Sequence, residues 1–224
     1  MKSANNSGAE TSLRPVSLRI AILGGTFDPV HIGHLRIAIR LRESGFNRVL
    51  MIPNKVPPHR AQPEASGDDR LSMLTLATQT LDGIEPCDIE LTQDGTSYSA
   101  RTIELLKAQF SDASLTWVMG NDAWNGFDRW HSPATLLEHA NLLVISRPGE
   151  EARHDGWLGQ IRDQNGCDLG ALLQRTDGAI CHQSWPELDI SASDLRQAIK
   201  RGDNIAFLTP PAVSDYINDK QLYR

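Results

Sequence analysis

The sequence predicts an α/β protein built on a doubly wound, mostly parallel sheet, with a small helical subdomain at its C-terminal end. Two observations predict the sheet. Short runs rich in Ile, Leu and Val alternate with amphipathic stretches along the 224-residue chain, as βαβ units require. The runs are also nearly all apolar, which is typical of strands buried on both faces.

Each element follows from these patterns. The predicted strands are Arg19–Leu23, Arg48–Ile52, Asp88–Leu91, Leu115–Met119, Asn141–Ile145 and Ala179–His182. The predicted helices between them are Gly33–Ser44, Asp68–Leu81, Ser97–Phe110 and Pro133–His139. The stretch Gly149–Asp177 is polar, and we expect an insertion with short helical pieces there. Gly202 and Pro210-Pro211 divide the stretch 191–223 into two or three short helices.

The chain is therefore expected to have three parts: a loose N-terminal tail over residues 1–17, a sheet domain over 18–189 and a helical C-terminal subdomain over 190–224. The tail is polar and has no apolar signal core. No apolar run approaches the length of a membrane span. Three scattered cysteines do not suit a disulfide framework or a zinc ribbon. These features predict a soluble, cytoplasmic protein with reduced thiols.

The overall charge narrows the choice of partners. The formal net charge is -6, from 22 Lys and Arg against 28 Asp and Glu, and the pI is about 5.6. A protein held to nucleic acid by its overall charge is usually basic, so we expect no nucleic-acid partner. Small anionic substrates are compatible with this balance because they respond to local charge.

The first predicted strand runs directly into the segment Gly24–His34, which reads GGTFDPVHIGH. Two glycines after a buried strand let the backbone come close to a ligand. Ligands bind beyond the carboxyl ends of strands in open α/β sheets, and the N-terminus of the next helix favours phosphate there. The segment matches neither G-x-x-x-x-G-K-[ST] nor G-x-G-x-x-G. It therefore predicts a phosphate site of a different kind.

His31 and His34 are three residues apart and fall on one face of a helix that begins nearby. The helix dipole opposes protonation of imidazoles at this end. A bound polyphosphate would reverse that effect and hold both rings as donors. The alternative is a turn with two surface histidines.

The segment Gly24–His34 resembles the signature G-G-[ST]-F-D-P-x-H-x-G-H of the nucleotidyltransferase superfamily. The resemblance implies a Rossmann-like, dinucleotide-binding type of fold. It also implies transfer of a nucleotidyl group from a nucleoside triphosphate.

Further segments resemble one branch of that superfamily, the bacterial nicotinate-nucleotide adenylyltransferases. Pro53–Arg60, with the sequence PNKVPPHR, is similar to the substrate loop of that branch. The other similar segments are Thr96–Ser99, Gly120–Asp122, Phe127–His131 and Ile190–Arg196. Thr96 and Ser99 depart from the family's Pro-Ser-Tyr-Thr, which leaves the shape of that turn open. The resemblance extends over roughly Arg19 to Arg224.

The resemblance implies a reaction in which ATP and nicotinate mononucleotide give nicotinate adenine dinucleotide and pyrophosphate. It implies catalytic roles for His31, His34 and Arg196, which would contact the triphosphate. The implied ATP-binding residues are Gly24, Gly25, Thr26, Phe27, His34, Gly120, Asp122, Ile190, Ser191, Ser193 and Arg196. Mg²⁺ would arrive with ATP and keep mostly water and phosphate ligands. No cluster of metal-binding side chains suggests a dedicated protein cage.

The implied pyridine-nucleotide residues are Lys55, His59, Arg60, Ser99, Trp130 and His131. Trp130 would stack on the pyridine ring, and backbone N–H groups near Ser99 and His131 would hold its carboxylate. A solvated basic loop is the alternative for Lys55, His59 and Arg60, and a core position is the alternative for Trp130.

The segment Ser191–Arg196 also allows a direct prediction. Ser191 and Asp194 form a loose capping box at the start of a helix. Arg196 then lies near the first turn, where the helix dipole disfavours a cation. It either pairs locally with Asp194 or binds an anion held between the guanidinium and the helix N-terminus.

Three other functions compete with this one. The enzyme could prefer nicotinamide mononucleotide, since only the pyridine pocket separates the two substrates. The string His31–His34 also occurs in class I aminoacyl-tRNA synthetases, but their Lys-Met-Ser-Lys-Ser motif is missing. A nucleotide-binding sensor without catalysis is the alternative that is not an enzyme, although His31, His34 and Arg196 are all present.

Overall fold

The computed structural model describes residues 18–55, 62–146, 150–186 and 188–224. A six-stranded sheet lies at its centre, in the order β3-β2-β1-β4-β5-β6, and every neighbouring pair is parallel. The strands are β1 (Arg19–Gly25), β2 (Arg48–Pro53), β3 (Ile84–Pro86), β4 (Ser114–Gly120), β5 (Asn141–Ser146) and β6 (Ile180–Ser184). The order reverses between β1 and β4, which makes the carboxyl ends of these two strands the expected ligand crevice.

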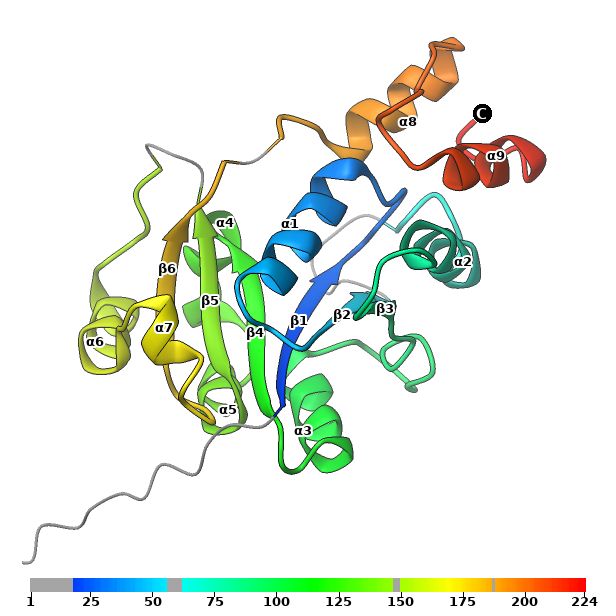
Figure 1. Cartoon of the computed structure of the whole chain (residues 1–224). Helices are drawn as coiled ribbons and strands as arrows, with labels where there is room; N and C mark the ends of the chain where they lie inside the picture. The colour runs from blue at the N-terminus through cyan, green and yellow to red at the C-terminus, as the bar shows by residue number, and fades with distance from the viewer. Residues whose placement is uncertain (1–17, 56–61, 147–149, 187) are drawn as a thin grey trace, which may run out of the picture.

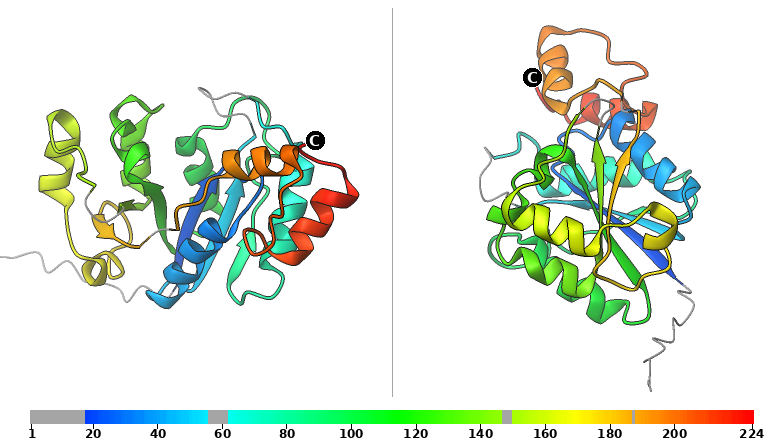
Figure 2. Two further views of the ribbon diagram at one scale, coloured as in Figure 1. Left: turned by 90° about the horizontal axis from the view of Figure 1, so that it is seen from above. Right: turned by 90° about the vertical axis from the view of Figure 1, so that its left-hand side faces the viewer.

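Helices cover both faces of this sheet (Figures 1 and 2). One face packs against α1 (Ile32–Glu43), α2 (Gly67–Thr78) and α7 (Leu169–Leu172), and α9 (Pro211–Asp219) packs beside α2. The other face packs against α3 (Ser99–Gln109), α4 (Asn121–Trp124), α5 (Pro133–His139) and α6 (Gly156–Asn165). The doubly wound α/β fold predicted from the apolar runs is confirmed.

The burial patterns explain why these segments take up these elements. Residues of β1, β2, β4 and β5 are buried on both faces, which accounts for their continuous apolar sequences. In α1 the buried residues are Leu35, Ala38 and Leu41, three apart, so one stripe of the helix faces the sheet. The amphipathic spacing of apolar residues in α1 therefore predicts which side of this helix packs in the core.

The C-terminal stretch forms two helices at the end of the sheet where the strands finish, α8 (Ala192–Arg201) and α9 (Figures 1 and 2). Gly202 ends α8 with φ 77°, a left-handed conformation that glycine adopts readily. The carbonyl of Leu208, between the two helices, accepts the backbone N–H of Ile32 at 3.0 Å. The stretch is thereby attached to the first turn of α1.

One predicted strand is wrong. The third strand is Ile84–Pro86, and Asp88–Leu91 is instead a turn in which the Leu91 N–H donates to the Asp88 carbonyl at 2.8 Å. The true strand is short, lies at the sheet edge and ends in proline, which lacks a ladder donor. Its apolar signal was too short to recognise.

The polar stretch Gly149–Asp177 contains α6 and α7, as the expected short helical pieces. In the described ranges no helix is long and apolar enough to cross a membrane.

Candidate active site

The turn between β1 and α1 has an unusual backbone. Phe27 has a φ of 51° and is fully buried, and the Asp28-Pro29 peptide bond is cis. The Phe27 ring folds back onto Gly25, where a Cβ atom would lie only 3.0 Å from it. A side chain at position 25 would therefore press against the Phe27 ring.

His31 and His34 are brought together at the N-terminus of α1. Their rings stack with centroids 3.7 Å apart, and Phe27 contacts His34 edge-on at 4.9 Å. The His31 backbone N–H donates to Nδ1 of His34 at 3.3 Å. In the neutral ring this places the His34 proton on Nε2, which is left to donate to a ligand.

Both imidazoles are neutral near pH 7. Burial lowers the pKa of His31 to about 4. Burial, and after it the charge of a protonated His31, lowers the pKa of His34 to about 3. Nδ1 of His31 is buried and has no hydrogen-bond partner among the described residues. A pair of uncharged, partly unsatisfied imidazoles at a helix N-terminus is well suited to receive an anion.

Gly33 allows α1 and the segment before α8 to approach each other. A Cβ atom at Gly33 would lie 2.8 Å from Cγ2 of Ile190 and 3.0 Å from the His31 ring. Any larger residue would have to push one of these groups aside. Ile190, expected from the resemblance to line the ATP site, therefore lies against Gly33, between the two histidines in the sequence.

Arg196 reaches this turn from α8. Its Nη1 donates to the Asp28 carbonyl at 2.7 Å, and its Nε donates to Glu64 at 3.0 Å. Ser191 caps α8 by accepting the Asp194 N–H at 3.1 Å, as predicted. The Asp194 carboxylate accepts the Ser191 hydroxyl, while Arg196 contacts Asp28 and Glu64 instead. Ser193 Oγ lies 3.4 Å from Nη2 of Arg196.

Gly120 and Asp122 lie beyond the carboxyl end of β4, the strand next to β1. A Cβ atom at Gly120 would lie 2.7 Å from a carboxylate oxygen of Asp122, so a larger residue there would displace the Asp122 side chain. Asp122 is exposed at the start of α4. On the other side of the turn, a Cβ atom at Gly24 would make only ordinary contact, 3.6 Å from Trp117.

A second cluster lies at the N-terminus of α3. Ser99 begins this helix, and the preceding Tyr98 packs on His131 with ring centroids 4.4 Å apart. Trp130 is half-buried and meets Phe127 edge-on at 5.4 Å. The first turn of α3 has no side-chain cap and no acidic residue. Its N–H groups are therefore available to a negatively charged group.

The Lys55 ammonium group donates a hydrogen bond to the carbonyl of Gln93. This hydrogen bond joins the end of β2 to the loop before α3. Lys55 is thus held in place and is not a freely solvated side chain. His59 and Arg60 lie outside the described residues.

Several groups at the site had not been predicted. Glu90 is buried and accepts hydroxyls from Ser97 and, at 2.9 Å, from Thr102. Burial raises the pKa of this carboxyl group. Arg70 and Tyr223 contact the turn after β1, as described below. The sequence gives little sign of these residues, because each acts on a segment far away along the chain.

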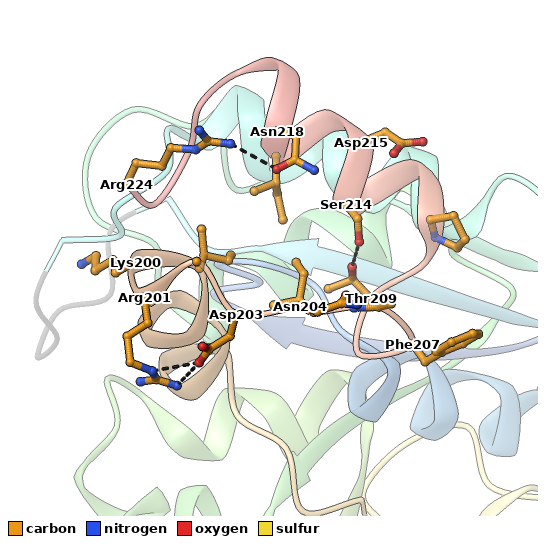
Figure 3. A pocket seen from close by; sticks show the side chains of 16 residues that line it. Lys200, Arg201, Asp203, Asn204, Phe207, Thr209, Ser214, Asp215, Asn218 and Arg224 are labelled. Atoms are coloured by element: carbon orange, nitrogen blue, oxygen red, sulfur yellow. Dashed lines mark hydrogen bonds and ion pairs between the residues drawn. The ribbon is translucent and has the colours of Figure 1, made fainter.

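A groove of about 820 Å³ lies between α8 and α9 (Figure 3). Phe207, with a φ of 66° and 88% exposed, is at its edge. None of the predicted site residues that the structure describes lines this groove. We therefore place the candidate active site at the carboxyl ends of β1 and β4 and not in this groove.

Comparisons with known proteins identify the relatives of this chain. Residues 22–198 match the cytidylyltransferase-like family. The protein of Chromohalobacter salexigens named probable nicotinate-nucleotide adenylyltransferase is 38% identical over 209 residues, covering 92% of this chain and 95% of its own. The protein of the same name from Hydrogenovibrio crunogenus is 39% identical over 206 residues, covering 92% and 97%.

A solved structure supports the fold independently. The nicotinic acid mononucleotide adenylyltransferase of Plasmodium falciparum, complexed with NaAD, superposes with a TM-score of 0.70 at 16% identity. The alignment covers 92% of this chain and 97% of that one. Sequence similarity over almost the whole length, a matching fold and the histidine pair after β1 together show that this chain belongs to the nicotinate-nucleotide adenylyltransferase family.

Proposed function

We propose that this protein transfers the adenylyl group of ATP to nicotinate mononucleotide, a step of NAD biosynthesis. An oxygen of the mononucleotide phosphate attacks the α-phosphorus of ATP. The bond from that phosphorus to the bridging oxygen breaks, and pyrophosphate leaves with its electron pair. The products are nicotinate adenine dinucleotide and pyrophosphate. The nucleophile is already an anion, so the reaction needs no general base.

The single observation that carries this proposal is the stacked, neutral pair His31 and His34 at the N-terminus of α1, with Arg196 on the same turn. Charge builds on the leaving pyrophosphate, and donors that are already oriented stabilise it without reorganisation. His34 would donate from Nε2 to the bridging oxygen. His31 would contact the α- or β-phosphate. Arg196 would release its hydrogen bond with Glu64 and bind the β- and γ-phosphates of ATP instead.

The remaining ATP contacts follow from the same turn. The backbone of Gly24–Phe27 and the side chain of Thr26 would line the phosphate pocket. Gly120 and Asp122 would orient the ribose or adenine at the end of β4. Ile190, Ser191 and Ser193 would close the nucleotide site from the side of α8.

At the other end of the site, the first turn of α3 near Ser99 would hold the pyridine carboxylate through its backbone N–H groups. This is the observation that favours nicotinate over nicotinamide mononucleotide, because an amide offers no negative charge to that helix terminus. Trp130 and His131 would flank the ring. Lys55, His59 and Arg60 would contact the phosphate end of the pyridine mononucleotide.

Mg²⁺ would be carried in by ATP, with phosphate oxygens and water as its ligands. The described part of the chain contains no group of three His, Cys, Asp or Glu side chains arranged to hold a metal. The Asp28 carboxylate, in the turn between β1 and α1, already accepts three hydrogen bonds. The metal would supply charge neutralisation on the triphosphate.

We also propose that residues 18–189 form the nucleotidyltransferase domain and that residues 190–224 complete its ATP site. The supporting contacts are those of Ile190 with Gly33 and of Arg196 with Asp28. Residues 1–17 would be a tail preceding the domain. A reducing cytoplasmic location agrees with three unpaired cysteines.

The test is to identify the products after mixing the protein with ATP, Mg²⁺ and either pyridine mononucleotide. We expect nicotinate adenine dinucleotide and one equivalent of pyrophosphate, with a lower kcat/KM for nicotinamide mononucleotide. Tight ATP binding without pyrophosphate release would instead identify a nucleotide sensor. A preference for nicotinamide mononucleotide would overturn the role given to the first turn of α3.

A further inference from the structure

The penultimate residue of the chain reaches the turn that carries the catalytic histidines. Tyr223 is 5% exposed, and its hydroxyl donates to Oδ1 of Asp28 at 2.8 Å across 195 residues of sequence. Figure 1 shows the C-terminus beside α9, near the sheet end to which α8 and the start of α1 also belong. The next residue, Arg224, instead donates a hydrogen bond to Asn218 at the groove between α8 and α9 (Figure 3). The tyrosine is therefore a specific inward contact of an otherwise exposed terminus.

Asp28 receives more than this one hydrogen bond. Its carboxylate also accepts the backbone N–H groups of Glu64 at 2.8 Å and Ala65 at 3.0 Å. Each oxygen is thus held, and the side chain is 4% exposed. Such a buried carboxylate, bonded at both oxygens, fixes the position of its own backbone, because any rotation would leave donors without acceptors.

Arg196 makes its hydrogen bond with the backbone of Asp28, and its Nη1 also lies 3.8 Å from the Asp28 carboxylate. The Asp28 carbonyl accepts Nη1 of Arg196 at 2.7 Å, and the next residues are the cis Pro29, Val30 and His31. One residue before Phe27, the Thr26 carbonyl accepts Nη1 of Arg70, which is 1% exposed. The turn is therefore held from α2 on one side and from the C-terminus on the other.

The titratable groups around Tyr223 agree with a donor role. Burial, and then the charge of Asp28, hold the pKa of Tyr223 well above its usual range. Arg196 and Arg70 oppose this shift but do not reverse it. The hydroxyl therefore keeps its proton and is the donor in its hydrogen bond with Asp28.

From this geometry we propose that Tyr223 is a positioning residue for adenylyl transfer: through Asp28 it holds the turn that aligns Arg196 and His31 on the triphosphate. The role rests on the proposed function and deepens it. Tyr223 itself would touch no substrate. Its effect would appear in the reaction of ATP and not in binding of the pyridine mononucleotide, whose site lies at α3.

The chain offers a matched control. Tyr216 also donates its hydroxyl to an aspartate, Asp69, at 2.9 Å, and it also lies in the C-terminal stretch. That hydrogen bond joins α9 to α2 and does not reach the turn after β1. Tyr216→Phe and Tyr223→Phe each remove one oxygen atom, so both are expected to fold.

The experiment compares steady-state kinetics of the wild type and the two variants. We expect Tyr223→Phe to lower kcat/KM for ATP about tenfold, as loss of one hydrogen bond to a charged group can. The KM for nicotinate mononucleotide should stay within about twofold of the wild type, and Tyr216→Phe should stay within about twofold in every constant. Circular dichroism confirms that each protein is folded at the assay temperature.

A double-mutant cycle then tests the route of the effect. If Tyr223 acts on Arg196 through Asp28, adding Tyr223→Phe to Arg196→Gln should cost much less than tenfold in kcat/KM for ATP. Equal kinetics of Tyr223→Phe and Tyr216→Phe, or independent effects in the cycle, would overturn the positioning role. A wild type that forms no product would instead contradict the proposed adenylyl transfer itself.

Discussion

At the residue scale, the proposed function depends on two histidines whose surroundings keep them uncharged. Their stacking and burial would cost free energy if either ring carried a proton, since desolvation penalises the charged form. A triphosphate reverses this penalty because it supplies negative charge and acceptors at the same place. If ATP binds here as proposed, we expect the two rings to become charged only in the complex.

Replacing His34 should impair the chemical step. We expect His34→Ala to lower kcat by about 10²-fold or more, as removal of one oriented donor to a developing charge does. The KM for nicotinate mononucleotide should change little. Steady-state assays of both substrates check this, with His154→Ala, at the distant His154–Asp163 pair, as a control. Near-normal turnover in His34→Ala would rule out the assigned role.

ATP binding should also take up protons. The pKa values of His31 and His34, about 4 and 3 in the free protein, should rise when phosphates bind. Around pH 6 the complex would then hold more protons than the free protein, and affinity for ATP should increase as the pH falls towards that value. Calorimetry in buffers of different ionisation enthalpy measures the uptake. A His31→Gln/His34→Gln double variant that takes up as many protons as the wild type would contradict this explanation.

At the scale of elements, the N-terminal ends of helices position the predicted site residues. The starts of α1, α3, α4 and α8 each carry at least one predicted site residue. Local signals in the sequence located the starts of α1, α3 and α8 to within about two positions, because caps, glycines and apolar spacing depend on neighbouring residues. The short helix α4 was not predicted. The edge strand β3 could not be found in this way, since three residues ending in proline give no period to read.

The start of α3 provides a test. Thr102 donates to the buried Glu90 and lies on the first turn, beside Ser99. We expect Thr102→Val to raise the KM for nicotinate mononucleotide about three- to tenfold while kcat stays nearly constant, because the freed Glu90 would let this turn move. The measurement is the KM for nicotinate mononucleotide of Thr102→Val divided by that of the wild type.

Thr78→Val is the matched control for this variant. Thr78 is also a buried helical threonine that bonds the carbonyl four residues earlier, at 2.9 Å, and it is far along α2 from the site. Both variants should lose some stability. If both raise the KM equally, the effect of Thr102→Val is one of general loosening and not of positioning.

At the scale of the whole molecule, buried neutral histidines set the response to acid. His182 on β6 has its pKa lowered to about 4 by burial and by nearby Arg162 and His154, and its Nε2 has no partner among the described residues. A histidine with a folded pKa below its unfolded value contributes stability that is complete above about pH 6.5. That contribution is lost as the pH falls towards 4.

We therefore expect the free energy of unfolding to decrease between pH 6.5 and pH 4 in the absence of ATP. His182→Phe keeps an aromatic ring against Trp124 and removes one of the titrating groups. It should reduce the loss of stability between pH 7 and pH 5 by about 1 kcal/mol, allowing for partial solvent access to the ring. Urea unfolding at the two pH values checks this. An unchanged pH dependence would show that His182 is not one of the groups responsible.

The sequence by itself determined the α/β class, the turn after β1, the histidine pair and the cap of α8, because each depends on residues close together in the chain. It also carried the family resemblance. Only the tertiary structure decided what Arg196 and Tyr223 contact. These hydrogen bonds join Asp28 to residues 168 and 195 positions away, and such contacts leave no periodicity or local spacing in a sequence. They form because the sheet brings its strand ends, and the segments that follow them, to one edge of the molecule.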